Sequence, residues 1–227
     1  FNYFKDRLAR FYGTVVNLAI ANDWMHKNPF AGIRFQEKEV IREVLTKEEI
    51  ERMMCKEFAL PRLEYVRDVF IFCVFTGMAY VDVNNLRQEH IVRDNNDDLW
   101  IRKARQKTNN MCNIPLLKIP QLLMEKYKNH PLCTKTGALL PVPSNQKMNS
   151  YLKEIADFCG IQKNLTTHTA RHTFATVVAL ANGVSMENIA KMLGHSDIRM
   201  TQRYAKVMDS SIMRDMENVD KLFKSSE

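Results

Sequence analysis

The chain has 227 residues, of which 45% are hydrophobic and 26% charged, with only seven glycines and seven prolines. This is the composition of an ordinary soluble globular protein and argues against a disordered or fibrous chain. The length allows one substantial domain and a smaller one. An excess of 33 Lys+Arg over 26 Asp+Glu gives a net charge of +7, which favours a polyanionic partner without naming it.

The cysteines and the apolar runs exclude two further classes. The five cysteines are scattered and form no C-x-x-C pair, so we expect reduced thiols in a cytoplasmic protein and no redox or metal site. No apolar run reaches the ~18 residues of a membrane span, and we expect no membrane partner. The basic N-terminal segment lacks the apolar core of a signal peptide.

The N-terminal region predicts one helix followed by a linker. Apolar residues recur at helical spacing from Tyr3 to about Met25, before Asn28-Pro29. A single helix cannot bury its own apolar stripe, so we expect that preceding residues are missing or that a partner covers it. The charged stretch 37–43 is interpreted as the linker to the next domain.

The following region changes from helices to strands. Thr46-Lys-Glu-Glu49 is a capping-box pattern that predicts a helix to about Phe58, and Leu63 to Phe75 predicts a strongly apolar helix that ends at Thr76-Gly77. Short apolar runs between polar turns then predict three antiparallel strands, at residues 90–93, 99–107 and 111–116.

The rest of the chain is predicted to be helical. The expected helices span residues 119–129, 144–159, 169–181, 186–193, 196–207 and 211–223, the last being amphipathic. Gly183 and Gly194 are natural helix ends. The predicted fold is therefore mainly α with a small three-stranded antiparallel sheet.

Four polar side chains with complementary chemistry lie in the C-terminal third. His168 and Arg171 share one side of a helix, His195 follows Gly194, and Tyr204 lies on the next helix. A phenol of pKa ~10 is a nucleophile only where a site helps to remove its proton. Arg171 can clamp phosphate oxygens, and the histidines can donate hydrogen bonds to the growing charge. Such chemistry needs no metal or other cofactor.

These residues carry a specific resemblance. The stretches Thr166-Thr-His168-Thr-Ala-Arg171-His172-Thr-Phe-Ala175, Leu193-Gly-His195 and Thr201-Gln-Arg-Tyr204 resemble the second conserved box of the tyrosine recombinases, the phage-integrase family. The resemblance covers essentially the whole chain and is strongest to integrases of bacterial conjugative and mobile elements. It implies that residues 1–36 end a helical core-binding domain, that 37–43 are a linker, and that 44–227 form the catalytic domain.

The resemblance also implies a reaction and partners. Tyr204 would attack a phosphodiester of double-stranded DNA at an attachment site, forming a 3′-phosphotyrosine that a second strand's 5′-hydroxyl resolves. The C-terminal helix would pack onto a neighbouring protomer, in a tetramer at synapsis. The expected location is the cytoplasm of a bacterium, at the nucleoid.

Basic residues of the strand region are assigned by the same resemblance and by charge density. Lys107 occupies the place of the family's catalytic lysine and is expected to protonate the 5′-oxygen leaving group, with phosphate binding as the alternative. Arg102 and Lys103 lie in a stretch without acidic residues and are expected to contact DNA phosphates.

The sequence departs from the family at one position. Most members carry an arginine a few residues after the Thr-Gly pair, where this chain has Ala79. Losing one such donor typically costs ~10²–10³ in rate. Arg105 is our candidate replacement, because residues i and i+2 of a strand share a face and Arg105 would then point the same way as Lys107. Arg87 and Arg67 are the other candidates.

Three other interpretations remain open. The Ala79 change allows a DNA-binding protein with weakened or lost catalysis, and a type IB topoisomerase would share the tyrosine chemistry. His168 and His172 have a zinc-binding spacing, but neither a glutamate base nor a third ligand accompanies them. We therefore interpret His172 as structural support for the site.

Overall fold

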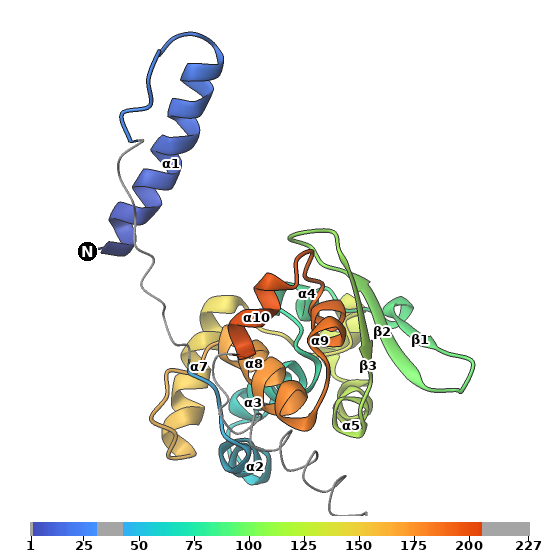
Figure 1. Cartoon of the computed structure of the whole chain (residues 1–227). Helices are drawn as coiled ribbons and strands as arrows, with labels where there is room; N and C mark the ends of the chain where they lie inside the picture. The colour runs from blue at the N-terminus through green and yellow to red at the C-terminus, as the bar shows by residue number, and fades with distance from the viewer. Residues whose placement is uncertain (1, 31–42, 206–227) are drawn as a thin grey trace, which may run out of the picture. The chain divides into compact units, whose positions relative to one another are not determined.

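A computed structural model of the chain describes residues 2–30 and 43–205 (Figure 1). The chain divides into two compact units, Phe1–Ile41 and Arg42–Glu227. In the first unit, helix α1 spans Asn2–Ala21. It ends before Met25 because Asp23 takes a left-handed φ of 56° and the Trp24 N–H returns to the carbonyl of Ala19. Phe11 and Leu18 on α1 are exposed.

The second unit is built around the buried helix α3. The first helices of this unit are α2 (Lys47–Cys55), α3 (Pro61–Thr76), α4 (Tyr80–Asn84), α5 (Lys118–Tyr127), α6 (Pro131–Thr136) and α7 (Asn145–Phe158). Helix α3 contacts α2, α5 and α7, and its Phe70 and Phe72 are fully buried. The capping box predicted at Thr46 and Glu49 is present at the start of α2. Short helices α4 and α6 were not predicted.

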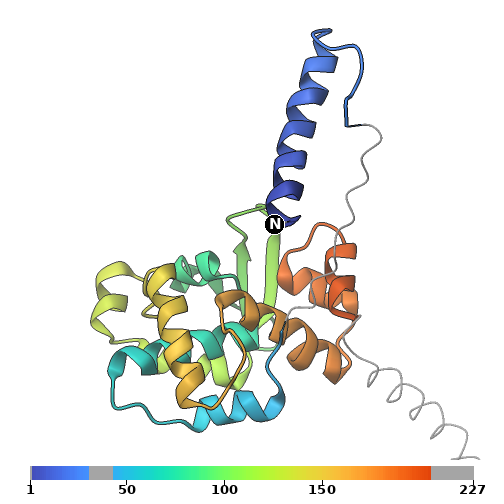
Figure 2. The same cartoon turned by 90° about the vertical axis from the view of Figure 1, so that its left-hand side faces the viewer.

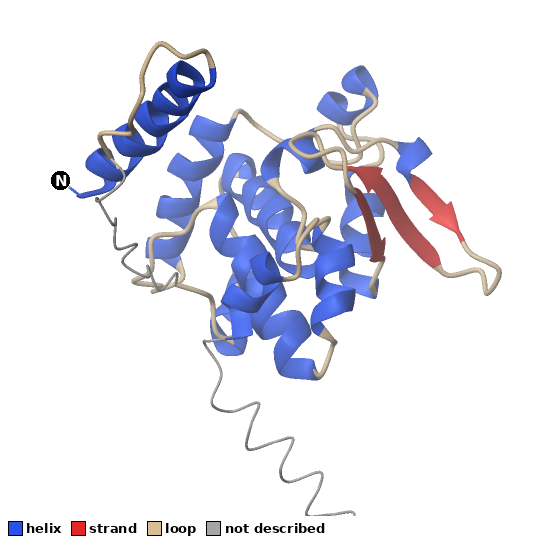
Figure 3. Cartoon of the chain, turned by 45° about the horizontal axis from the view of Figure 1, so that its top comes forward, coloured by secondary structure: helices blue, strands red, loops and turns tan. Residues whose placement is uncertain are grey.

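A three-stranded antiparallel sheet lies beside the helices (Figure 3). Strands β1 (Ile91–Arg93), β2 (Leu99–Ala104) and β3 (Met111–Pro115) are hydrogen-bonded in the order β1-β2-β3, with Val92 opposite Trp100 and Lys103 opposite Cys112. The 3-10 turn η1 (Gln88–His90) precedes β1. The mainly helical fold with this sheet confirms the predicted fold class.

Strand β2 is shorter than predicted. It ends at Ala104 because the chain turns over residues 105–109, where the Asn109 N–H donates to the carbonyl of Arg105 and Asn109 takes a φ of 55°. The alternation of faces along a strand therefore does not extend from Arg105 to Lys107.

The C-terminal helices gather on one side of the second unit (Figure 2). They are α8 (Thr167–Thr173), the π-helical segment η2 (Phe174–Ala179), the 3-10 turn η3 (Leu180–Asn182), α9 (Met186–Leu193) and α10 (Arg199–Ala205). One regular helix over 169–181 was predicted. Instead, the hydroxyls of Thr173 and Thr176 bond the carbonyls four residues back, which competes with regular helical bonding. The predicted helix 211–223 lies outside the described residues.

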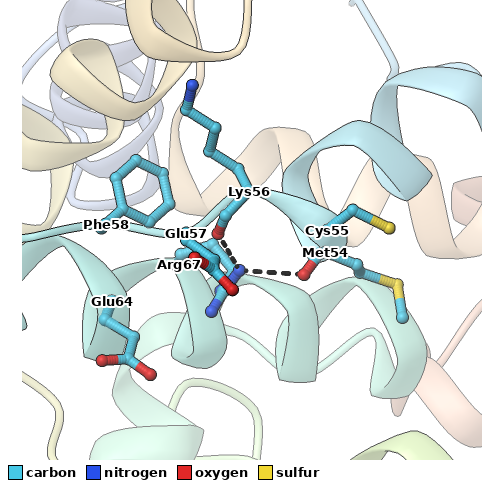
Figure 4. A pocket seen from close by; sticks show the side chains of 7 residues that line it. All are labelled: Met54, Cys55, Lys56, Glu57, Phe58, Glu64 and Arg67. Atoms are coloured by element: carbon cyan, nitrogen blue, oxygen red, sulfur yellow. Dashed lines mark hydrogen bonds between the residues drawn. The ribbon is translucent and has the colours of Figure 1, made fainter.

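The second unit also contains a pocket and, beside it, a buried ion pair. A pocket between α2 and α3 is lined by residues 54–58, Glu64 and Arg67 (Figure 4). There, buried Arg67 donates to the carbonyls of Met53, Met54 and Lys56 and pairs with Asp68. These contacts hold Arg67, one of the candidate replacements for the arginine missing at Ala79, at the end of α2. Among the described residues, no helix is both long and apolar enough to cross a membrane.

Candidate active site

Arg171 is the buried centre of the site. Its Nη1 donates to the carbonyl of Gly77 at 2.7 Å, and its Nη2 donates to the carbonyl of Leu193 at 2.6 Å. These acceptors end α3 and α9, so two segments far apart in sequence hold the guanidinium. Burial lowers the pKa of Arg171, and the neighbouring cation of Arg105 lowers it further. The group nevertheless stays charged at neutral pH, because an arginine starts from a very high pKa.

His195 lies directly against Arg171. Its Nε2 is 3.2 Å from Arg171 Nη2, and its Nδ1 is 2.8 Å from Thr201 Oγ1. Burial, followed by the charges of Arg171 and Arg105, lowers the pKa of His195 to about 4. The imidazole is therefore neutral at pH 7.

The ring of Tyr204 lies near those of two histidines. Its ring is nearly parallel to that of His195, with centroids 6.3 Å apart at 9°, and tilted to that of His172, with centroids 5.2 Å apart at 59°. Only 8% of Tyr204 is exposed. The structure thus brings Arg171, His195, His172 and Tyr204 together.

Arg105 reaches the same group from the turn after β2. Its Nη1 donates to the carbonyl of Gly194 at 3.4 Å, and its Nε lies 3.9 Å from Asp82 Oδ2. The other carboxylate oxygen of Asp82 accepts the backbone N–H of Gln106 at 2.9 Å. Asn110 also donates to the Gly194 carbonyl, at 3.2 Å. Asp82 and Asn110 thereby fix the turn against the loop that carries His195.

The remaining predicted residues are exposed or partly exposed. His168, Arg102 and Lys107 are exposed, and Lys107 has no hydrogen-bond or ion-pair partner among the described residues. Lys103 is half-buried, with its Nζ 3.2 Å from His90 Nε2. Arg87 donates to the carbonyls of Asn84 and Leu86, so it is engaged locally.

Three functional neighbours were not predicted from the sequence. Asp82, Asn110 and Thr201 each hold a side chain or a loop of the site. Thr201 carried a usable signal, because it lies three residues before Tyr204 and so shares its side of a helix. Asp82 and Asn110 gave none, because their contacts depend on how distant segments meet.

Comparison with known proteins identifies the family. The model of the phage integrase family matches residues 43–211, which is most of the chain. The chain belongs to the phage integrase family. This confirms the resemblance found in the sequence, and the match includes Arg171, His195 and Tyr204.

Individual members of the phage integrase family are similar over parts of their length. The tyrosine recombinase XerD of Staphylococcus saprophyticus is 40% identical over 95 residues, which cover 42% of this chain and 31% of the relative. XerD of Staphylococcus epidermidis is 38% identical over the same length. The matched segment therefore spans about a third of these curated relatives.

Solved structures of phage-integrase-family proteins share the fold. An integrase of the transposon Tn1549, solved with a circular intermediate DNA, has a TM-score of 0.66 and 16% identity, covering 94% of this chain and 78% of that one. The XerA recombinase has a TM-score of 0.59 and 24% identity, covering 80% of this chain and 66% of that one.

This member of the phage integrase family lacks a charged side chain at position 79. Ala79 is the N-cap residue of α4 and is partly buried. The positive charge of Arg105 instead acts on this site, because it lowers the pKa of both Arg171 and His195. Arg105 is therefore a second arginine whose charge acts on this site, beside Arg171 itself.

Proposed function

We propose that this chain is the catalytic part of a site-specific DNA recombinase or integrase, with Tyr204 as its nucleophile. The observation that carries the proposal is the buried positive charge of Arg171, held beside a tyrosine whose ring lies near those of two histidines. A desolvated cation of fixed geometry suits the charge that develops on a phosphate in the transition state.

The proposed reaction is a transesterification. The Tyr204 oxygen attacks the phosphorus, an O–P bond forms, and the bond to the 5′-oxygen breaks. The tyrosine loses its proton, and the leaving 5′-oxygen gains one. The product is a 3′-phosphotyrosine, which a 5′-hydroxyl of a second strand attacks to restore a phosphodiester. No cofactor is required, because each step exchanges one phosphoester bond for another.

Arg105 is proposed to supply the charge that Ala79 cannot. Its Nε is buried and has no hydrogen-bond partner among the described residues. A buried donor without an acceptor typically costs about 1–3 kcal/mol, so a phosphate oxygen at this position would remove a penalty as well as add an attraction. Asp82 then orients Arg105 from 3.9 Å, a separation of Oδ2 and Nε too long for a hydrogen bond, so the Nε–H stays available to a phosphate.

The exposed cations are proposed to act on bound DNA. Lys107 lies on the turn after β2 and has no hydrogen-bond or ion-pair partner within residues 2–30 and 43–205, so its ammonium is proposed to protonate the 5′-oxygen. His168 is proposed to contact the reacting phosphate, and Arg102 and Lys103 to bind phosphates of the DNA backbone. His172 is proposed to support Tyr204 by packing against its ring.

The domain roles complete the proposal. Residues 1–36 are proposed as the end of the core-binding domain, 37–43 as the linker, and 44–227 as the catalytic domain. DNA-bound protomers are proposed to exchange their C-terminal helices in a tetramer. Double-stranded attachment sites are the proposed substrate, and structures of the same fold that were solved with a circular intermediate DNA and with a COC′ core site are consistent with a DNA substrate.

A nicked suicide substrate tests the reaction. After incubation and denaturing electrophoresis, the native chain should give a covalent protein–DNA band, and Tyr204→Phe should give none. DNA affinity should be nearly equal for both, because binding rests on many phosphate contacts. A band from Tyr204→Phe would refute the assignment. Binding without any band from the native chain would favour the alternative, a DNA-binding protein that has lost catalysis.

A second pair of variants tests Arg105. Arg105→Ala should slow formation of the band by about 10²–10³, and Ala79→Arg in the same chain should partly restore it. Undiminished cleavage by Arg105→Ala would exclude the replacement. Relaxation of plasmids that lack any specific site would favour a topoisomerase.

A further inference from the structure

The two ring nitrogens of His195 face partners of different kinds. Nε2 faces Arg171 Nη2 at 3.2 Å, and Nδ1 faces Thr201 Oγ1 at 2.8 Å. Thr201 is fully buried, so water does not compete for its hydroxyl. These two contacts therefore determine where the imidazole can carry its proton.

The chemistry of the partners leaves one arrangement for a neutral ring. A guanidinium has N–H donors and no acceptor, so Nε2 must face Arg171 with its lone pair. A neutral imidazole has a single N–H, which must then lie on Nδ1. The threonine hydroxyl can accept that hydrogen bond. With the proton on Nε2 instead, two donors would face each other across 3.2 Å.

We propose that Thr201 is a positioning residue that holds His195 as the Nδ1–H tautomer, so that Nε2 accepts a hydrogen bond from Arg171. Arg171 then meets three acceptors, namely the carbonyls of Gly77 and Leu193 and the Nε2 of His195. Acceptors on several sides fix the plane of the guanidinium. Thr201 thus acts on Arg171 through His195. Its effect on DNA cleavage rests on the function proposed above.

The position of Thr201 couples this arrangement to the nucleophile. Thr201 and Tyr204 are three residues apart on α10, so they lie on the same side of that helix. The ring of His195 contacts both, by the hydrogen bond to Thr201 and by its parallel packing on Tyr204. The helix that places the phenol therefore also orients the histidine. In the DNA-free chain, this makes the Nε2 of His195 an acceptor and its Nδ1–H a donor.

Nitrogen-15 NMR of the chain without DNA tests the tautomer. The ring nitrogens of His195, assigned by comparison with His195→Gln, should show a protonated Nδ1 and an unprotonated Nε2 at pH 7. Thr201→Ser should keep this pattern. Thr201→Val, which has the same shape without the hydroxyl, leaves the buried Nδ1–H without an acceptor, so the ring should turn away from Arg171 and lose the pattern. A native ring protonated mainly on Nε2, or an unchanged pattern in a folded Thr201→Val, would overturn the proposal.

Single-turnover cleavage of a suicide substrate tests the consequence. Thr201→Val should cut about 10–100 times more slowly at saturating DNA, with unchanged affinity, whereas Thr201→Ser should stay within a few fold of the native rate. A native rate for Thr201→Val would overturn the effect on cleavage. If Thr201→Val does not fold, the native and Thr201→Ser spectra still decide the tautomer.

The two measurements separate this inference from the proposed function. The spectra need neither DNA nor catalysis, so a chain with the expected tautomer but no covalent band would refute the recombinase and not the role of Thr201. A chain that forms the band but carries the other tautomer would refute the role of Thr201 alone.

Discussion

Replacing Gly77 with alanine should destabilise the second unit by more than an ordinary glycine substitution does. Gly77 has a φ of 67°, a left-handed conformation that costs an L-residue about 1–2 kcal/mol. A Cβ at this position would clash with the ring of Phe174 and lie 2.8 Å from Leu193 Cδ2. Overpacking of this kind costs about 1–3 kcal/mol. The expected total for Gly77→Ala is therefore about 2–5 kcal/mol.

Gly183→Ala is the matched control. Gly183 also has a left-handed φ, of 82°, but apart from its two chain neighbours no heavy atom of the described residues lies within 4 Å of the position of an added Cβ. Only the backbone cost of about 1–2 kcal/mol applies there. The difference between the two variants therefore isolates the contact of residue 77 with Phe174 and Leu193.

Urea unfolding followed by circular dichroism measures both free energies of unfolding. With slopes of about 1–3 kcal/mol per molar urea, the midpoint of Gly77→Ala should lie roughly 1 M below that of Gly183→Ala. Cleavage should fall as well, because the Gly77 carbonyl accepts a hydrogen bond from Arg171. Equal midpoints for the two variants would refute the reasoning, since they would mean that the close approach costs nothing.

Three further outcomes are expected. The pKa of His195 is near 6.5 in the unfolded chain but about 4 in the folded chain, so the free energy of unfolding should fall as the pH drops through that range, by up to about 3 kcal/mol. Urea midpoints measured against pH should therefore decrease toward pH 4, and His195→Gln should reduce this dependence. Arg67→Met breaks a buried ion pair and should therefore lower the free energy of unfolding, measured in urea, by about 3–5 kcal/mol. Cleavage by the folded fraction should be unchanged. Lys107→Ala should change stability by less than about 0.5 kcal/mol but slow the suicide reaction by about 10²–10⁴, and a sulfur leaving group at the 5′ position, which needs no proton donor, should restore the rate.

Local patterns predicted most of the fold. The capping box at Thr46, the apolar helix ending at Gly77 and the three strands were read from spacing and turn residues, and the structure contains them. The errors concern element ends and short elements. Helix α4, which follows Ala79, has only five residues and is too short to show a helical periodicity. The π-helical segment depends on hydroxyl contacts that spacing does not express.

The site was predictable to the extent that its residues carry a family motif. Arg171, His195 and Tyr204 were identified in this way, and the structure brings them together. Arg105 was selected by alternation along a strand, although the strand ends one residue before it. Its approach to Gly194 arises from tertiary packing, as does its contact with Asp82. Such contacts between distant segments require the folded structure.

The two carbonyls that hold Arg171 have a consequence for when the proposed DNA cleavage can begin. They come from the ends of α3 and α9, more than a hundred residues apart in the chain. A nascent or partly unfolded chain has the arginine but not the pair of acceptors that aims it. The ability to cleave DNA would therefore arise only after the ends of α3 and α9 have packed against Arg171. Completion of folding would then be a precondition for the reaction.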